Sequence, residues 1–257
     1  MTAQDRSFLD LGGRLVVVTG ASSGLGRACA ETLSEHGARI VLIGRDPATL
    51  AATRRGLSGD GHEIVVLDLH QLDRIGPEIV RVAGQAGRVY GLCHAAGVVE
   101  TRPLSVTTPD VVQQMMTVNL LAGLELARAV ARRDVMDPDG GSLVFLSSVY
   151  GLVGVAGEAG YSATKGAVAA AVRSMAIELA RRRVRVNAIS PGLVLTPMTD
   201  SALGRLSPEQ VAAIEQKHPL GLGTQADVAR AALFLLAPAT TWITGIDLVV
   251  DGGYSAQ

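Results

Sequence analysis

A tyrosine and a lysine lie four residues apart at Tyr161 and Lys165, in a segment rich in helix-forming residues. Positions i and i+4 share one face of a helix, so both side chains can reach the same substrate. A free tyrosine has a pKa of about 10, and a nearby lysine cation lowers that pKa by stabilising the tyrosinate. Such a pair can donate a proton to a carbonyl oxygen or take one from an alcohol.

A serine completes this candidate chemistry. Ser148 follows the predicted strand 142–146, so its hydroxyl can hold the same substrate oxygen. A tyrosine and a lysine at this spacing are also typical of an ordinary amphipathic helix face. The catalytic interpretation therefore depends on the other motifs of the chain.

A glycine-rich segment follows the first predicted strand and reads Thr19-Gly20-Ala21-Ser22-Ser23-Gly24-Leu25-Gly26. Gly20 allows a tight turn, Gly24 lets backbone amides approach a phosphate, and Gly26 permits close packing of helix and strand. The following helix offers free N–H groups and a partial positive charge to a pyrophosphate. No Lys-Ser/Thr pair follows the last glycine, which disfavours a P-loop. We expect Gly20 to Gly26 to bind a dinucleotide.

The end of the second predicted strand indicates which dinucleotide. An acidic residue about 20 positions beyond the glycines usually holds the adenosine ribose, but Gly44 and Arg45 stand there. An arginine can pair with a 2′-phosphate, so we expect NADP to be favoured, with NAD as the alternative. Asp46, a predicted helix N-cap, would weaken this preference. Arg45 could also simply be an exposed residue at the start of a helix.

Short β-branched runs alternate with longer amphipathic segments along the chain. The predicted strands are 15–18, 39–43, 63–67, 91–94, 142–146, 185–189 and 247–250. The predicted helices are 25–36, 47–57, 72–86, 109–133, 160–183 and 225–237. This alternation predicts an α/β fold, a Rossmann-type doubly wound parallel sheet of seven strands with helices on both faces. Asp68, just after the third strand, is placed to accept a hydrogen bond from an adenine amino group, next to Leu69.

We find no internal linker or repeat, so residues 1–257 are expected to form one domain. The segment 193–222 breaks the alternation with three prolines and a short predicted helix at 207–216. It leaves the carboxyl edge of the sheet, where ligands bind in open α/β folds. We interpret it as a substrate lid with apolar residues; a plain surface insertion is the alternative.

Composition excludes several other classes of protein. The net charge is -1, with 23 basic and 24 acidic residues, so neither nucleic acid nor an anionic membrane is an expected partner. No stretch is apolar for the roughly 20 residues that a bilayer requires. Cys29 and Cys93 lie in apolar segments, which favours buried free thiols in a cytoplasmic protein. The histidines lack metal-ligand spacing, so no metal is expected.

Together these motifs resemble the short-chain dehydrogenase/reductase family, in its single-domain branch of about 250 residues, over essentially the whole chain. The resemblance rests on the glycine-rich segment, Ser148 and Tyr161-x-x-x-Lys165, and on four further motifs: His94-Ala95-Ala96-Gly97, Val118-Asn119-Leu120, Pro191-Gly192 with Thr196, and Asp251-Gly252-Gly253. His94 departs from the family, which usually has an asparagine there that ties neighbouring strands together. A histidine can supply similar hydrogen bonds.

The resemblance implies a role for each matched residue. Tyr161 would be the general acid/base, Ser148 would orient the substrate carbonyl, and Lys165 would also bind the nicotinamide ribose. Asn119 would hold a water that extends the proton relay. The remaining expected cofactor contacts are Ala95, Ala96, Gly97, Pro191, Gly192, Val194 and Thr196.

The implied activity is hydride transfer between a nicotinamide cofactor and a small carbonyl or alcohol substrate. One alternative is a 3-oxoacyl-carrier-protein reductase, but Ile177 stands about where such relatives often carry an arginine, although Arg173 is near. A non-catalytic cofactor-binding scaffold is a second alternative, and a Rossmann methyltransferase is a third. Neither of these two accounts for the serine, tyrosine, lysine and asparagine together.

The resemblance also implies self-association. Relatives pair the helices that correspond to 109–133 and 160–183 across a dimer interface and use the C-terminal strand region to complete a tetramer. We therefore expect a homodimer or homotetramer. Periodicity alone does not require it, since an amphipathic helix can bury its face within one chain.

Overall fold

Seven parallel strands form one sheet in the order β3-β2-β1-β4-β5-β6-β7. This computed structural model describes residues 8–204 and 207–256. The strands are β1 (Leu15–Thr19), β2 (Arg39–Gly44), β3 (Glu63–Val66), β4 (Val89–His94), β5 (Gly141–Leu146), β6 (Val184–Pro191) and β7 (Asp247–Val250). The order reverses between β1 and β4, which marks the switch point where ligands bind in doubly wound sheets. The predicted Rossmann-type α/β fold is confirmed.

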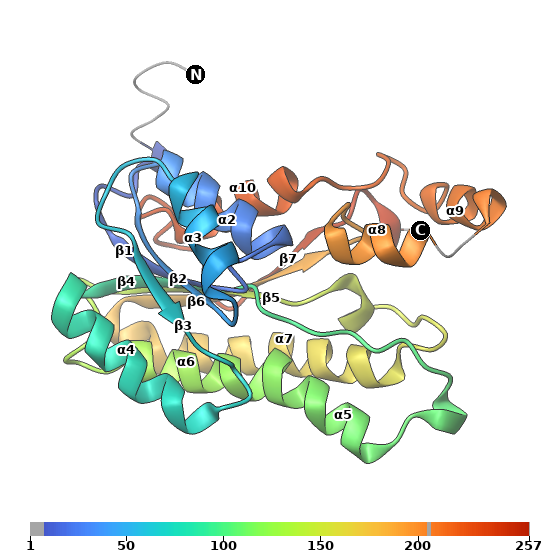
Figure 1. Cartoon of the computed structure of the whole chain (residues 1–257), viewed down its shortest axis with the longest axis horizontal. Coiled ribbons are helices and arrows are strands. Elements are labelled where there is room, and N and C mark those ends of the chain that lie inside the picture. The colour runs from blue at the N-terminus through green and yellow to red at the C-terminus, as the bar shows by residue number, and fades with distance from the viewer. Residues whose placement is uncertain (1–7, 205–206, 257) are drawn as a thin grey trace.

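Helices cover both faces of the sheet (Figure 1). One face carries α2 (Gly24–Glu35), α3 (Pro47–Arg55) and α10 (Gln225–Leu236). The other face carries α4 (Leu72–Ala86), α5 (Pro109–Met116), α6 (Ala122–Val130) and α7 (Ala159–Leu179). None of the described helices is long and apolar enough to cross a membrane.

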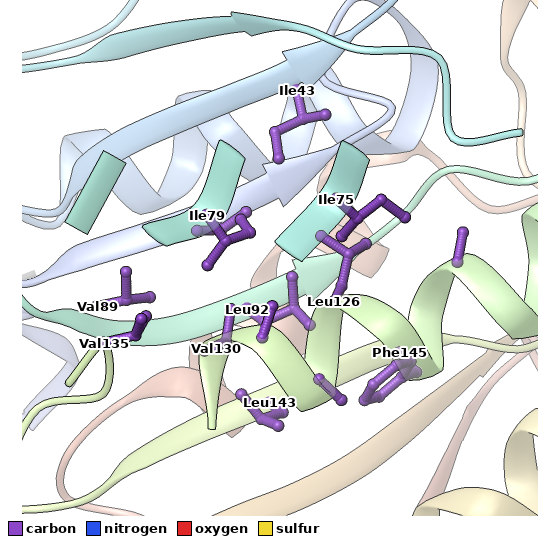
Figure 2. Close-up of a cluster of buried hydrophobic side chains, with 14 of the residues drawn as sticks. Ile43, Ile75, Ile79, Val89, Leu92, Leu126, Val130, Val135, Leu143 and Phe145 are labelled. Carbon is purple, nitrogen blue, oxygen red and sulfur yellow. The ribbon is translucent and has the colours of Figure 1, made fainter. Parts of the chain in front are cut away.

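The two cores follow from the alternation of side chains along each strand. Val16 and Val18 of β1 belong to one buried cluster with residues of α2 and α10. Val17, between them, belongs to the opposite cluster. Figure 2 shows residues of α4 and α6 in that cluster, among them Ile75, Ile79 and Leu126. Burial on both faces explains why the central parts of β1 and β2 are continuous apolar runs rather than alternating ones.

The helix predicted over 109–133 is not α-helical throughout. α5 and α6 are joined by a π-helical turn at Thr117–Leu121, and α6 ends at Val130. A π-helical turn inserts one extra residue into a helix and is frequent at functional sites. Here the turn holds Asn119, which is 1% exposed.

Two further boundaries differ from the sequence prediction. α7 ends at Leu179 and continues as a short turn at Ala180–Arg182, after which Arg183 adopts a left-handed φ of 54°. The segment 193–222 holds two helices rather than one: α8 (Pro197–Leu203), which was not predicted, and α9 (Pro208–Glu215). Residues 205 and 206 of this segment lie outside the described residues.

Candidate active site

A cleft of about 400 Å³ lies along the carboxyl ends of the strands. Every residue that the sequence predicted to contact a cofactor lines it, whereas Asn119 lies behind its wall. The predicted lining residues are Gly20, Ser22, Ser23, Gly24, Leu25, Gly26, Gly44, Arg45, Asp68, Leu69, Ala95, Ala96, Gly97, Tyr161, Lys165, Pro191, Gly192, Val194 and Thr196. Ser148 lines the cleft as well. One cavity therefore contains both the candidate nucleotide site and the candidate proton donor.

The glycine-rich turn is packed too closely for side chains at two positions. A Cβ atom at Gly26 would lie 2.3 Å from the backbone oxygen of Gly20. Gly20 has a φ of +64°, and a Cβ there would lie 3.0 Å from the Ala96 Cα atom. The absence of side chains thus lets β1, α2 and the loop after β4 meet at one point. This is the backbone cradle that a pyrophosphate at the start of α2 requires.

The far end of the cleft carries the nucleotide-selecting candidates. Arg45 is exposed there, directly after β2. Asp46 accepts hydrogen bonds from the amides of Ala48 and Thr49, so it is an N-cap of α3, as predicted. Because its carboxylate is engaged with the helix, it opposes a phosphate at Arg45 less than a free carboxylate would.

Asp68 also meets an unpredicted neighbour. Its carboxylate accepts a hydrogen bond from the His70 amide at 3.0 Å and lies 2.9 Å from His70 Nδ1. These bonds lower the pKa of Asp68, so it is an anion at neutral pH. The carboxylate remains at the cleft wall as a hydrogen-bond acceptor, and His70 lines the same wall.

Ser148 lies at the turn between β5 and the loop that leads to α7. Its backbone is extended, and its hydroxyl accepts a hydrogen bond from the Tyr150 amide at 3.2 Å. Only 9% of the residue is exposed. The hydroxyl is also a hydrogen-bond partner of Tyr161, so a substrate oxygen in the cleft would take the place of the tyrosine as its acceptor.

Tyr161 stands in the first turn of α7 and is half-buried at the cleft wall. Burial raises the pKa of its hydroxyl to about 12, and the hydrogen bond with Ser148 opposes that rise. The sequence predicted a lowered pKa from Lys165, so the direction is opposite. Desolvation of the tyrosinate outweighs the other influences in this structure.

Lys165 is 4% exposed, and burial lowers its pKa to about 8. Its Nζ atom donates a hydrogen bond to the Leu146 carbonyl at 2.8 Å and lies 5.6 Å from the centre of the Tyr161 ring. The predicted i, i+4 pairing on one helix face is thus present. The ammonium contacts the strand end rather than the tyrosine hydroxyl, so it does not offset the desolvation that raises the pKa of Tyr161.

Asn119 links three parts of the site. Its Oδ1 accepts from the Val98 amide at 2.8 Å, and its Nδ2 donates to the Val98 carbonyl at 2.9 Å. Nδ2 also lies 3.0 Å from the Thr164 hydroxyl, on the turn of α7 between Tyr161 and Lys165. The side chain therefore holds the loop after β4 against the candidate catalytic helix.

The residues that follow β6 close the cleft opposite α2. Thr196 is 8% exposed and forms hydrogen bonds with Thr199, whose hydroxyl donates to the Val194 carbonyl at 2.7 Å. A Cβ at Gly192 would lie 2.9 Å from the Asp251 Cα, so the C-terminal segment packs directly on this wall.

Several lining residues were missed by the sequence analysis: Ile43, Leu67, His70, Val98, Val99, Val118, Leu146, Ser147, Pro197 and Thr199. Many of them stand at or just after strand ends, a position that the predicted strands already marked. Seven of the ten are apolar and gave no chemical signal of a site, and the other three, His70, Ser147 and Thr199, matched no motif that was recognised in the sequence.

Comparisons with known proteins add a second line of evidence. The family model described as enoyl-(acyl carrier protein) reductase matches residues 20–255. Carbonyl reductase family member 4 of Danio rerio is 36% identical, over 93% of this chain and 97% of that protein. Glucose 1-dehydrogenase of Gluconobacter oxydans is 35% identical, over 94% of this chain and 91% of that protein.

A solved structure shows the same arrangement of elements. It is described as an NAD(P)-dependent gluconate 5-dehydrogenase of Beutenbergia cavernae with bound NADP at low occupancy. It is 32% identical in sequence and superposes with a TM-score of 0.89, covering 97% of this chain and 100% of its own. The likeness therefore extends over the whole sheet and over the cleft.

Proposed function

The chain belongs to the short-chain dehydrogenase/reductase family of NAD(P)-dependent oxidoreductases, and we propose that it is an NADP-preferring reductase of small ketones or aldehydes. One observation carries this proposal. Ser148, Tyr161 and Lys165 line the same cleft as the glycine-rich turn and Arg45. A hydride donor bound at the glycine-rich turn would then lie in the same cavity as the candidate proton donor, Tyr161.

Ser148, Tyr161 and Lys165 have separate roles in the proposed reduction. When bound, the nicotinamide cofactor supplies a hydride to the carbonyl carbon. Ser148 holds the carbonyl oxygen, and Tyr161 donates its hydroxyl proton to that oxygen as negative charge develops there. Lys165 holds the ribose beside the nicotinamide and lies close enough to influence the charge on Tyr161. Alcohol oxidation is the reverse of these steps.

The protonation state of Tyr161 supports the reductive direction. A pKa of about 12 keeps the hydroxyl protonated at neutral pH, as a proton donor must be. Lys165, with a pKa of about 8, can exchange a proton near neutral pH, and because its ammonium contacts the Leu146 carbonyl it would pass that proton to Tyr161 through an intervening group. The water relay predicted at Asn119 stays a proposal. Its side-chain amide is already bonded to Val98 and Thr164, which favours a positioning role.

NADP is preferred in this proposal because of Arg45. The guanidinium is exposed at the cleft end where the adenosine ribose would lie, and Asp46 is occupied as a helix cap. A 2′-phosphate can form charge-assisted hydrogen bonds with an arginine. NAD lacks the 2′-phosphate, so Arg45 would not strengthen its binding.

A free small molecule is proposed as substrate rather than an acyl group on a carrier protein. Ile177 of α7 is 80% exposed and stands about where carrier-protein reductases often carry an arginine, although Arg173 is near. An apolar side chain there offers nothing to an acidic carrier. The segment 193–222, with α8 and α9, is proposed as the lid over this substrate.

Self-association through α5, α6 and α7 is also proposed. α7 carries small or apolar exposed residues such as Ala163, Ala170 and Ile177, which a partner helix could cover. Sedimentation of the wild type and of Ile177→Asp tests this. A dimer or tetramer weakened by the substitution would support it, and a stable wild-type monomer would refute it.

The function is tested by measuring initial rates of NADPH and NADH oxidation against a panel of ketones, aldehydes and acyl thioesters. We expect NADPH-dependent reduction of small ketones. Reduction of acyl thioesters alone would favour the carrier-protein alternative. Cofactor binding without any turnover across the panel would favour the scaffold alternative.

A further inference from the structure

A histidine without a role in the proposed reduction lies at the nucleotide end of the cleft. His70 follows the end of β3 and lines the cleft together with Asp68 and Arg45. Proton transfer takes place elsewhere in the cleft, beside Tyr161, so the reaction itself does not explain His70. The side chain is 43% exposed and is therefore accessible to a dinucleotide bound in the cleft.

The ends of β2 and β3 bring two opposite charges to this part of the cleft. Gly44 of β2 is paired with Val66 of β3, and the Leu67 amide donates a hydrogen bond to the Gly44 carbonyl at 2.8 Å. Arg45 follows Gly44, and Asp68 follows Leu67. A guanidinium and a carboxylate thus leave the sheet edge from neighbouring strands. Opposite charges placed in this way attract each other, so the backbone alone would predict an ion pair between them.

The carboxylate pairs with His70 instead. Nδ1 of His70 lies 2.9 Å from Asp68 Oδ1, and the His70 amide donates to the same oxygen at 3.0 Å. Because a carboxylate only accepts hydrogen bonds, Nδ1 carries the proton of the first of these bonds. The bond from the His70 amide is the largest influence that lowers the pKa of Asp68, the ring adds to it, and the charge of Arg45 contributes least. Arg45 forms no ion pair with this carboxylate, although both residues belong to the described part of the chain.

This pairing leaves one carboxylate oxygen for a ligand. Both hydrogen bonds end on Oδ1, and no donor among the described residues is bonded to Oδ2. The amino group of an adenine can donate a charge-assisted hydrogen bond to Oδ2. A hypoxanthine carries a carbonyl oxygen at the same position, which a carboxylate repels. With Asp68 held in this way, the cleft can distinguish the two bases.

The same pairing keeps Arg45 available for a phosphate. The neighbouring carboxylate of Asp46 is engaged with the amides of α3, and that of Asp68 is engaged with His70. A guanidinium that is already bonded to a carboxylate has fewer N–H groups left for a 2′-phosphate. His70 and Arg45 therefore compete for Asp68, and in this structure His70 holds it.

We propose that His70 determines cofactor specificity by holding Asp68 toward the adenine ring and away from Arg45. This rests on the proposed function, because it assumes that NADP binds in the cleft. His70 acts through Asp68 and Arg45, so it is a positioning residue. One contact then favours both adenine over hypoxanthine and NADPH over NADH.

Equilibrium binding tests this inference without turnover. Isothermal titration calorimetry measures the Kd values of NADPH, of NADH and of the NADPH analogue that carries hypoxanthine in place of adenine. The proteins compared are the wild type, His70→Ala and His70→Asn. Because an ordinary hydrogen bond changes an affinity about threefold to tenfold, we expect His70→Ala to lower both preferences by that factor. His70→Asn keeps an N–H donor near the position of Nδ1 and should retain both.

A second background separates positioning from direct contact with the phosphate. An asparagine at position 68 cannot form an ion pair with Arg45, so in Asp68→Asn the further change His70→Ala should leave the preference for NADPH over NADH unaltered. A loss of the same size in that background would mean that His70 binds the phosphate itself, and would overturn the positioning role. His36→Ala removes a histidine that caps α2 outside the cleft, and as the matched control it should leave all Kd values unchanged.

The remaining outcomes separate this inference from the proposed function. Unchanged preferences in His70→Ala, with NADPH bound as tightly as by the wild type, would overturn the role of His70 and leave the reductase function standing. A wild type that binds neither NADPH nor NADH would refute the proposed function and the inference with it. If the wild type prefers NADH, the comparison of adenine with hypoxanthine still decides whether His70 positions Asp68.

Discussion

The Thr19 hydroxyl lies 2.9 Å from Nδ1 of His94, where β1 and β4 are paired and both side chains are buried. Thr19 Oγ1 also accepts a hydrogen bond from the Ala96 amide at 3.1 Å. When His94 Nδ1 is the acceptor, the Thr19 hydroxyl donates its hydrogen to the ring, so this hydroxyl both donates and accepts a hydrogen bond. Burial lowers the pKa of His94 to about 4, so the ring is neutral at physiological pH. His94 thus joins the two strands that carry the cleft, where the family usually has asparagine.

Gly123 of α6 makes room for this histidine. A Cβ at position 123 would lie 2.9 Å from His94 Cδ2, in a fully packed region. We predict that Gly123→Ala lowers the free energy of unfolding by about 1–3 kcal/mol through overpacking. In a His94→Asn background the same change should be nearly neutral or stabilising, because alanine favours a helix over glycine by about 1 kcal/mol.

Urea denaturation of the wild type, both single variants and the double variant measures this coupling. Equal effects of Gly123→Ala in the two backgrounds would mean that His94 and Gly123 are independent. The thermodynamic cycle also shows whether the His94 ring or the nearby Phe145 ring limits the room for a side chain at position 123.

We expect the burial of Lys165 to lower the stability of the folded protein. Its pKa falls from 10.5 to about 8 on folding, so the buried ammonium disfavours the folded state below pH 8 by about 3 kcal/mol. As pH rises from 8 toward 10.5, the unfolded chain holds the extra proton, and stability should rise. We predict that Lys165→Met is more stable than the wild type at pH 7 and that the difference shrinks by pH 10.

Thermal unfolding of both proteins from pH 7 to pH 10 tests this. The range stops at pH 10 because Tyr161, whose pKa is raised to about 12, begins to oppose the trend above that value. If the variant is the less stable protein at pH 7, the hydrogen bond to Leu146 outweighs the burial of the charge.

Arg45 should decide the preference for NADPH. A hydrogen bond to a charged group contributes about 1.5–3 kcal/mol, so Arg45→Ala should lower kcat/KM for NADPH roughly tenfold to a hundredfold. The value for NADH should change little, because NADH lacks the 2′-phosphate. Arg54→Ala, at the other end of α3, serves as the control for a general loss of positive charge. An equal loss of kcat/KM with both cofactors would mean that Arg45 supports folding rather than recognition of the 2′-phosphate.

The sequence was sufficient to predict the order of elements and most of the cleft. Strand runs and glycine spacings are local signals, and parallel topology places every strand end on one edge, so the residues that follow those ends had to meet there. This explains why Gly20, Arg45, Asp68 and Pro191 all line one cavity.

Other features depended on packing that no local pattern encodes. The π-helical turn at Asn119 is held by hydrogen bonds to Val98 and Thr164, which are distant in sequence. The raised pKa of Tyr161 follows from its burial, which spacing to Lys165 could not reveal. The contact between His218 and Tyr254 likewise joins two segments that only the folded chain brings together.

The central claim is that Tyr161 donates the proton during hydride transfer, and single-turnover kinetics test it most directly. The wild type and Tyr161→Phe are saturated with NADPH, mixed with a ketone that the wild type reduces, and followed at the absorbance of the reduced cofactor. Since general acid catalysis contributes typically 10²–10⁴-fold, we predict a loss of at least about a hundredfold in rate. Binding of NADPH should be retained. An unchanged rate in Tyr161→Phe would contradict the account.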